Sequence, residues 1–260
     1  MNVKEKLAAL EADLRSHAPL LVAYSGGVDS TLLLFVAHRV LGDAVQGIIA
    51  DSPSFPRQGF ADALAQARQL DLPVEVLATH ELENPDYASN PPNRCYICRR
   101  DFFSTLSVIA RERGFAAIAY GENADDSPEE RPGSQAAREF GILAPLRRAG
   151  LTKAEIRAIS RELNLPTADM PSQPCLSTRI PFGTPITREA LAKVEAGEAF
   201  LRGLGFRNLR VRHRNGGRRA KVQVAPEEWP ALQARSAEMQ AGLRAVGYEE
   251  TELDLLKPHI

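Results

Sequence analysis

Residues 19–42, PLLVAYSGGVDSTLLLFVAHRVLG, decide the fold of this chain. Their apolar start predicts a buried strand, the two central glycines predict a tight turn, and the apolar second half predicts a helix. Such a turn lets the backbone approach a ligand closely, and the following helix presents unpaired N–H groups and a positive dipole end. Serines on both sides of the turn add hydroxyl donors. We therefore predict a binding site for an anion as large as pyrophosphate, formed by Ser25, Gly26, Gly27, Val28, Asp29 and Ser30.

Asp29 is an unusual residue for an anion site, unless a divalent cation such as Mg²⁺ connects its carboxylate to the phosphates. The lysine of a Walker P-loop is absent, so the turn does not favour transfer of a γ-phosphoryl group. The alternative interpretation is a structural turn in which a serine caps the helix.

Strands alternate with helices on both sides of this turn. A helix with Leu7, Leu10 and Leu14 on one face is expected before it. Beyond it, we expect strands at 44–51, 73–79 and 115–121 and helices at 57–70, 99–114 and 151–163. Apolar strands that alternate with helices predict right-handed crossovers and a parallel sheet covered on both faces. The expected fold class is α/β.

The pattern changes in the segment 165–187, which contains five prolines, at 166, 171, 174, 181 and 185. Prolines at this density exclude a helix or a central strand, so the segment is either a linker or a functional loop. After it, we expect helices at 188–204 and 227–243 and strands at 208–214, 219–225 and 248–256. The expected parts are an α/β domain (1–165), a proline-rich loop (166–187) and a small α+β domain (188–260).

The composition narrows the function classes. The 260 residues are 44% hydrophobic and 25% charged, which is typical of a globular protein rather than a disordered one. With 32 Lys and Arg against 33 Asp and Glu, the net charge of −1 argues against a nucleic-acid partner. We expect no membrane association, because no apolar run reaches 18 residues. We expect the charged N-terminus to be no signal peptide, and three cysteines are too few for a disulfide framework. Both observations predict a cytoplasmic protein.

The three cysteines allow several interpretations. Cys95 and Cys98 form a C-x-x-C pair just before an expected helix, and Cys175 lies in the proline-rich loop. They could be a redox dithiol with one bystander, or three unrelated buried thiols. A structural zinc site would need four ligands, and no histidine has a matching spacing. Three thiolates could instead hold three irons of a 4Fe-4S cluster and leave the fourth iron open to bind a hydrosulfide.

Arginines provide candidate substrate ligands. Arg210, Arg212 and Arg214 alternate along an expected strand and so share one face. They suit a substrate with phosphate and carboxylate groups, although a solvated edge would look the same. Arg179 in the proline-rich loop and Arg94 beside the C-x-x-C pair are further candidates.

Polar residues also follow the expected strand at 115–121. Asn123, Asp125 and Asp126 could orient a nucleotide or Mg²⁺, or form a capped turn.

The hexapeptide SGGVDS at 25–30 resembles the PP-loop of the adenine-nucleotide α-hydrolases, which include NAD synthetase, GMP synthetase and tRNA thiolases. The resemblance implies that ATP is cleaved between its α- and β-phosphates and that a substrate oxygen becomes adenylated. It also implies that the end of the second strand, Ile49–Ser52, borders the adenosine, with Ile49, Asp51 and Ser52 as candidate binding residues.

A second resemblance is more specific. PCLSTRIPFGTPIT at 174–187 is similar to PCLASRIPYGTPIT, a signature of the LarE family of pyridinium-dicarboxylate mononucleotide sulfurtransferases. Segments 93–99, 120–126 and 131–146 also resemble that family, so the match extends over most of the chain. Ser177-Thr178 stands where Ala-Ser is expected, which keeps a hydroxyl at the second position.

The LarE resemblance implies a reaction. Such enzymes adenylate each carboxylate of pyridinium-3,5-dicarboxylate mononucleotide and replace an oxygen with sulfur, which yields the precursor of the nickel-pincer nucleotide of lactate racemase. Some members give up the sulfur of the cysteine that matches Cys175 and are left with dehydroalanine. Members with an additional C-x-x-C pair, as here, resemble a cluster-dependent type. The implied cofactors are ATP, Mg²⁺ and a 4Fe-4S cluster held by Cys95, Cys98 and Cys175; the sulfur donor is unidentified, and we expect a homo-oligomer.

Three other functions fit parts of the pattern. A tRNA thiolase would share the PP-loop and cluster, but the balanced charge and short C-terminal domain disfavour it. An amidating PP-loop synthetase would leave the cysteines without a role. A nucleotide sensor would bind ATP without releasing pyrophosphate.

Overall fold

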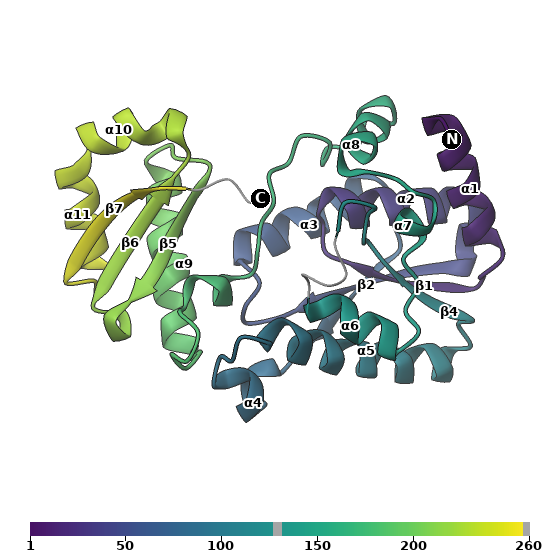
Figure 1. The fold of residues 1–260 in the computed structure, drawn as a ribbon, viewed down its shortest axis with the longest axis horizontal. Helices are drawn as coiled ribbons and strands as arrows, with labels where there is room; N and C mark the ends of the chain where they lie inside the picture. The colour runs from purple at the N-terminus through teal and green to yellow at the C-terminus, as the bar shows by residue number, and fades with distance from the viewer. Residues whose placement is uncertain (127–131, 257–260) are drawn as a thin grey trace. The chain divides into compact units, whose positions relative to one another are not determined.

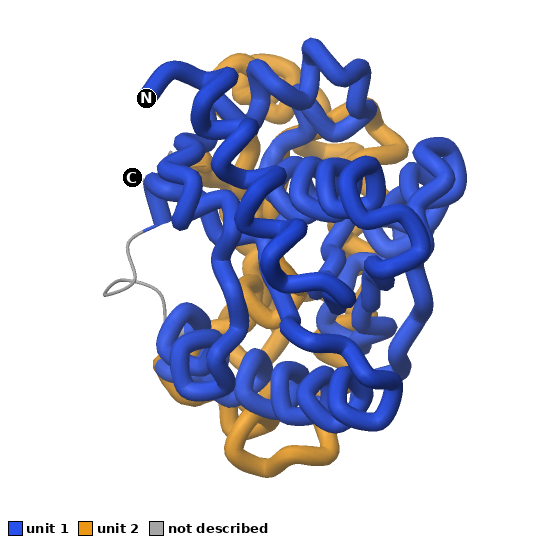
Figure 2. The backbone as a smooth tube through the Cα atoms, turned by 90° about the vertical axis from the view of Figure 1, so that its right-hand side faces the viewer, with its two compact units in different colours: residues 1–81, 93–173 blue, residues 82–92, 174–260 orange. Residues whose placement is uncertain are grey.

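The computed structural model describes residues 1–126 and 132–256. The chain forms two compact units, distinguished by colour in Figure 2: residues 1–81 with 93–173, and residues 82–92 with 174–260. The short segment 82–92 thus belongs to the second unit, although it precedes much of the first along the chain. No sequence pattern indicated that residues 82–92 fold with the second unit.

The first unit contains a parallel four-stranded sheet with the order β3-β2-β1-β4, which confirms the α/β prediction. Leu20 and Val22 of β1 pack into one core with residues of α1, α2, α3, α7 and α8. Leu21, on the opposite face of β1, packs into a second core with residues of α5 and α6. Helices therefore cover both faces of the sheet (Figure 1). The elements are α1 (Val3–Arg15), β1 (Leu20–Tyr24), α2 (Val28–Leu41), β2 (Val45–Asp51), α3 (Arg57–Gln69), β3 (Val74–Ala78), α5 (Arg94–Arg113), β4 (Ala117–Tyr120), α6 (Pro132–Glu139), α7 (Pro145–Arg148) and α8 (Lys153–Glu162).

Two details of the first unit differ from the sequence predictions. Helix α5 begins at Arg94 rather than at residue 99, so Cys95 and Cys98 lie inside its first turns rather than before it. Helices α6 and α7 lie between β4 and α8, where no helix was predicted. Both are short, and a short helix has little periodic pattern of its own.

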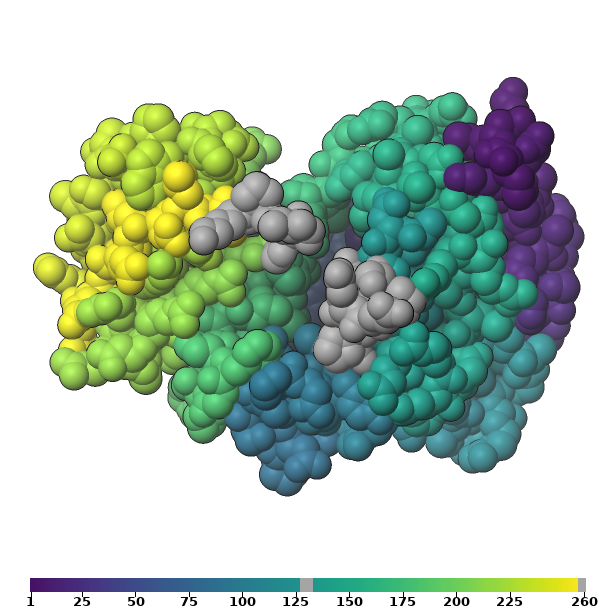
Figure 3. Space-filling view, viewed as in Figure 1, coloured from purple at the N-terminus to yellow at the C-terminus, as the bar shows by residue number. Residues whose placement is uncertain are grey.

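The second unit contains a three-stranded sheet with the order β5-β6-β7. Strands β5 and β6 are antiparallel, whereas β6 and β7 are parallel. Strand β7 forms one edge of this sheet, and its atoms are visible at the surface of the unit (Figure 3, yellow). The elements are α4 (Pro85–Ala88), the 3₁₀ helix η3 (Leu176–Arg179), α9 (Arg188–Gly203), β5 (Leu209–Arg214), β6 (Arg219–Val224), α10 (Trp229–Ala234), α11 (Ser236–Ala245) and β7 (Glu250–Leu255).

The proline-rich segment is irregular apart from η3, as its prolines predicted. The single helix expected at 227–243 is wrong: α10 and α11 are separate, because Arg235 between them has non-helical backbone angles. In the described part of the chain, no helix is long and apolar enough to cross a membrane.

Candidate functional site

The glycine turn lines a pocket of about 250 Å³ in the first unit. Ser25, Gly27, Asp29 and Ser30 form one side of it, at the carboxyl end of β1. The remaining lining residues come from the ends of β1, β2 and β4, from the segments after β2 and β4 and from α5: Ala23, Tyr24, Ala50, Phe55, Arg99, Phe102, Phe103, Tyr120 and Gly121. Ligands of open α/β sheets bind at this edge of the sheet.

Two glycines are required by the geometry around this turn. Gly26 has a φ of +70°, and a Cβ at this position would lie 2.3 Å from Cβ of Ala63. A Cβ on Gly121 would lie 2.8 Å from the backbone nitrogen of Ser30, because the end of β4 runs against the start of α2. A side chain at either position would force the turn and its neighbours apart.

The two serines close the turn on itself. The hydroxyl oxygens of Ser25 and Ser30 are 3.0 Å apart, and the Ser25 N–H donates to the Ser30 hydroxyl over 3.1 Å. The N-cap position of α2 is occupied by Gly27, and no side chain there accepts a hydrogen bond from the helix. The alternative interpretation, in which a serine caps the helix, is therefore wrong. The first N–H groups of α2 are thus left without a side-chain acceptor beside the pocket, as an anion site requires.

Asp29 is the acidic residue of the pocket. Its Oδ2 forms an ion pair with Lys153 at the start of α8. Its Oδ1 is buried and has no hydrogen-bond partner among the described residues. Burial raises the pKa of Asp29, against the opposing effect of Lys153. The orphaned Oδ1 fits a single carboxylate ligand to Mg²⁺, whose other ligands would be phosphate oxygens and water.

The segment after β4 forms a capped turn. The Asn123 N–H donates to Asp126 over 3.1 Å, and the Asp125 N–H donates to the Asn123 side chain over 2.9 Å. Asp125 also accepts from the backbone N–H of Lys153, so the turn supports the residue that pairs with Asp29. A role of Asn123 and Asp126 in binding the nucleotide stays a prediction.

The candidate residues at the end of β2 that were expected to border the adenosine are buried or paired with other side chains. Ile49 is fully buried in the core. Asp51 pairs with Arg57 at 2.5 Å, and the Ser52 hydroxyl donates to Glu81. From the end of β2 it is Ala50 that lines the pocket, and the contact of the other three with adenosine stays a prediction.

The three cysteines all lie among the described residues, and none of them forms a disulfide bond. Cys95 and Cys98 lie one turn apart on α5 in the first unit, and Cys175 lies just before η3 in the second. Within residues 1–126 and 132–256, no group of three or more His, Cys, Asp or Glu side chains is arranged to hold a metal ion. The iron–sulfur cluster therefore stays a prediction.

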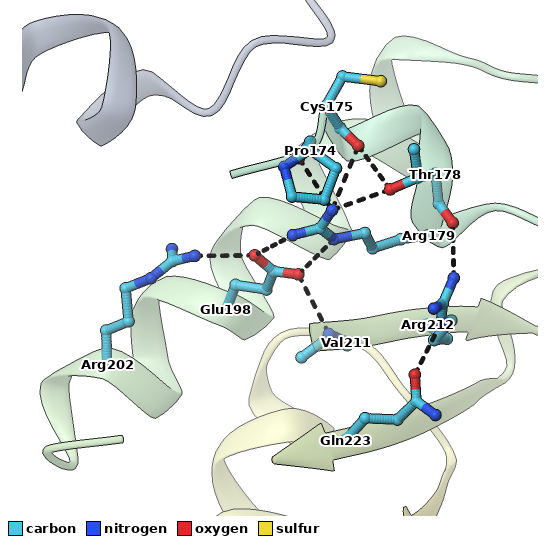
Figure 4. A network of polar contacts seen from close by, with 9 residues as sticks. All are labelled: Pro174, Cys175, Thr178, Arg179, Glu198, Arg202, Val211, Arg212 and Gln223. Carbon is cyan, nitrogen blue, oxygen red and sulfur yellow. Dashed lines mark hydrogen bonds and ion pairs between the residues drawn. The ribbon is translucent and has the colours of Figure 1, made fainter. Parts of the chain in front are cut away.

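Arg179 forms a buried ion pair with Glu198 of α9 (Figure 4). The guanidinium contacts both carboxylate oxygens, at 2.7 and 3.3 Å, and the side chains are 4% and 0% exposed. Glu198 also accepts from Arg202 on the same helix and from the backbone N–H of Val211 in β5. The carboxylate thus joins the proline-rich loop to a helix and a strand.

The other side of Arg179 holds the backbone at Cys175. Its Nη1 donates to the carbonyl oxygens of Pro174 and Cys175, at 2.9 and 3.3 Å. The hydroxyl of Thr178 donates to the same Cys175 carbonyl at 2.8 Å, while the sulfur points away from the network (Figure 4). The hydroxyl expected at position 178 is present and fixes the backbone of the cysteine. A substrate contact of Arg179 stays a prediction.

The alternating arginines of β5 differ in exposure. Arg210 is buried, Arg212 is half-buried and Arg214 is exposed. The alternative interpretation, in which these arginines only line a solvated edge of the sheet, is therefore wrong for Arg210 and Arg212. Arg212 donates to the Thr178 carbonyl and to Gln223, both at 2.8 Å. Burial lowers the pKa of Arg210 and of Arg212, and the charge of Arg179 adds to the effect. Contact of any of them, or of the buried Arg94, with a substrate stays a prediction.

Sequence reasoning missed two charged residues. Arg99 lines the pocket from α5, directly after the C-x-x-C pair. Glu198 lies among the buried residues Leu191, Val194 and Leu201 on the apolar face of α9. An acidic residue at core spacing was a signal that could have identified it.

The parallel sheet and the glycine-turn pocket define the first unit as a nucleotide-binding α/β domain of the PP-loop type. No family model matches the chain. It is 33% identical over 251 residues to the pyridinium-3,5-bisthiocarboxylic acid mononucleotide synthase of Lactiplantibacillus plantarum, covering 96% of this chain and 90% of that protein. It is 44% identical over 208 residues to an uncharacterized protein of Synechocystis, covering 80% of this chain and 77% of that protein. The chain belongs to the LarE-related family of PP-loop ATP pyrophosphatases.

A more distant similarity concerns the glutamine-hydrolyzing GMP synthases. The protein of Thermomicrobium roseum is 31% identical over 209 residues, which cover 70% of this chain and 39% of the synthase. The chain thus matches well under half of that larger enzyme.

Proposed function

We propose that the protein is an ATP-dependent sulfurtransferase that adenylates the carboxylates of pyridinium-3,5-dicarboxylate mononucleotide and replaces oxygen with sulfur, in the biosynthesis of the nickel-pincer nucleotide. The observation that carries the proposal is the similarity to the Lactiplantibacillus synthase, because it spans both units and so includes the PP-loop and the Cys175 segment. The buried network that fixes the backbone of Cys175 supports it further.

The first step would take place at the pocket of the first unit. A substrate carboxylate oxygen attacks the α-phosphorus of ATP, the bond to the β-phosphate breaks, and the electron pair leaves with pyrophosphate. The N–H groups at the start of α2 stabilise negative charge on the phosphate oxygens. Asp29 would hold Mg²⁺ through its free Oδ1, and bound Mg²⁺ would neutralise phosphate charge.

The second step would use a thiol. In the simplest form, the Cys175 thiolate attacks the acyl carbon of the adenylate, and AMP leaves. Cleavage of the cysteine Cβ–S bond with loss of the α-proton then gives the thiocarboxylate and leaves dehydroalanine. Restraint of the Cys175 backbone by Arg179 and Thr178 would orient the sulfur for attack.

The C-x-x-C pair supports the cluster-dependent alternative within this proposal. Three thiolates match the number that holds a 4Fe-4S cluster with one open iron, and such a cluster would supply sulfur over many turnovers. No step is assigned to the cluster, since the described residues contain no three-ligand group.

The test of the proposal is the mass of the products formed with ATP, Mg²⁺ and the pyridinium substrate after anaerobic purification. We expect sulfur in place of a carboxylate oxygen, and a product without sulfur would contradict the proposal. Iron and acid-labile sulfide are measured on the same sample. About four of each per chain, lost in Cys95→Ser, indicate the cluster, whereas a dehydroalanine at 175 indicates a sacrificial cysteine.

A second function is favoured by the similarity to the GMP synthases, which covers 70% of this chain in the protein of Thermomicrobium roseum. An amidating synthetase would use ammonia in place of sulfur, so the cysteines would have no role. Full turnover by Cys175→Ala would support this function and contradict sulfur transfer.

A further inference from the structure

Arg99 is a cation at the PP-loop pocket to which the proposed function assigns no role. It lines the pocket from α5, one turn after Cys95 on the same face of the helix. Among the described residues that line the pocket, only Arg99 and Asp29 carry a charge. Asp29 is already paired with Lys153, so Arg99 is the cation in the wall that is available to an anion.

The guanidinium of Arg99 is held by packing. Its Cζ lies 5.6 Å from the centre of the Tyr120 ring, and Phe103 contacts that ring edge-on at 5.8 Å. On the other side, a Cβ on Gly133 would lie 2.4 Å from Cδ of Arg99, so the glycine leaves the space that the arginine fills. In residues 1–126 and 132–256, no carboxylate forms an ion pair with Arg99. An arginine held by packing in the wall of this pocket, with no carboxylate partner among the described residues, points to a ligand anion.

We propose that Arg99 binds the β- and γ-phosphates of ATP and stabilises the leaving pyrophosphate. The inference rests on the proposed cleavage of ATP between its α- and β-phosphates. As the bond between the α-phosphorus and the bridging oxygen breaks, the electron pair moves to that oxygen, and the N–H groups of Arg99 donate to the pyrophosphate oxygens. No proton is transferred, because pyrophosphate leaves as an anion. AMP lacks both phosphates, so Arg99 contributes to the affinity for ATP and not to that for AMP.

The test is equilibrium binding of ATP with Mg²⁺, and separately of AMP, measured by titration calorimetry. Arg99→Met removes the charge and keeps the length of the side chain. We expect it to weaken ATP binding about 10- to 100-fold, which is the range for loss of charge-assisted hydrogen bonds, and to leave AMP binding unchanged. The matched control is Arg100→Met on the same helix, because Arg100 pairs with the adjacent Asp101 and does not line the pocket.

A second variant moves the guanidinium without removing it. Gly133→Ala places a methyl group 2.4 Å from Cδ of Arg99, which is too close, and the end of the arginine side chain can move aside without disturbing the fold. We expect ATP binding to weaken in the same direction as in Arg99→Met, again with AMP unaffected. Thermal melting confirms that each variant is folded.

Three results would overturn the inference: wild-type affinity for ATP in Arg99→Met, an equal loss of ATP and AMP binding, or a wild-type protein that does not bind ATP. The proposed function fails separately if the wild-type protein binds ATP but releases no pyrophosphate with the pyridinium substrate. In that case a selective loss of ATP binding in Arg99→Met would still show that Arg99 binds the β- and γ-phosphates.

Discussion

Asp29 is largely buried, and the ionised form that could bind Mg²⁺ is also the form that destabilises the fold. Its pKa is raised mainly by burial, so the folded protein holds a proton at this carboxyl more tightly than the unfolded chain does. The ionised form therefore destabilises the fold at pH values above the folded pKa, and this effect declines as the pH falls below that pKa and is gone below the pKa of the unfolded chain. The same ionised form is the one that can ligate Mg²⁺.

Asp29→Asn should therefore stabilise the fold at neutral pH while reducing ATP cleavage. We expect the free energy of unfolding to rise by about 0.5–2 kcal/mol, as measured by urea denaturation, because the buried charge is gone while its partner Lys153, 41% exposed, stays hydrated. In the wild type, acidification should weaken Mg²⁺-dependent ATP binding as Asp29 becomes protonated. The pH at which this happens should lie above the pKa of an ordinary aspartate. Asp43→Asn, at an exposed position, is the control. A variant that cleaves ATP at the wild-type rate would contradict the assignment of Asp29.

Substitution of Gly26 tests whether the conformation of the glycine turn is needed for ATP binding. Gly26→Ala combines an unfavourable positive φ with a Cβ placed against Ala63, so the loop must shift. We expect at least a tenfold loss of ATP affinity by calorimetry. Gly141→Ala also substitutes a glycine of positive φ, but it has open space around it and isolates the backbone effect. Equal ATP affinity in the two variants would show that the close approach at residue 26 is unimportant.

At the level of elements, one carboxylate joins the loop that carries Cys175 to the rest of its unit. Glu198 of α9 contacts Arg179 at the end of η3 and the backbone of β5. Because both charges are buried, loss of one partner leaves the other uncompensated.

Glu198→Gln should therefore lower the free energy of unfolding by about 3–5 kcal/mol in urea denaturation. The control is Asp169→Asn, which breaks an exposed ion pair with Arg161 and should change little. In the Cys95→Ser, Cys98→Ser background, Glu198→Gln should also change the rate at which iodoacetamide modifies Cys175. An unchanged rate would mean that the network does not restrain the cysteine.

The elements also show which features the sequence could predict. Each main strand of the parallel sheet is a short apolar run, and the positions of β1 to β4 follow from these runs. The first turns of α5 were missed because RCYICRR lacks an apolar repeat, which placed the C-x-x-C pair before the helix instead of inside it. The glycine turn was found because its residues are local in sequence. Arg99 was missed because its importance arises from contacts with other elements, such as Tyr120 of β4. Glu198 had a local signal, its core spacing on α9, but its partner Arg179 lies in another element and could not be predicted.

At the scale of the whole molecule, the chain passes between its two units more than once. Residues 82–92 fold with the second unit, where the Tyr87 hydroxyl lies 2.7 Å from that of Ser177 and Asn90 donates to the carbonyl of Pro181. These contacts join segments about 90 residues apart, a separation that no local pattern encodes. The segment that precedes the C-x-x-C pair is thus folded against the loop that carries Cys175.

We predict that this protein cleaves ATP between its α- and β-phosphates to activate a carboxylate. The most direct measurement follows the label of ATP carrying ³²P at the α-phosphate, incubated with Mg²⁺ and pyridinium-3,5-dicarboxylate mononucleotide. We predict that the label appears in AMP, with pyrophosphate released and with formation dependent on the pyridinium substrate. Label in ADP, or AMP formed equally well without that substrate, would contradict the account.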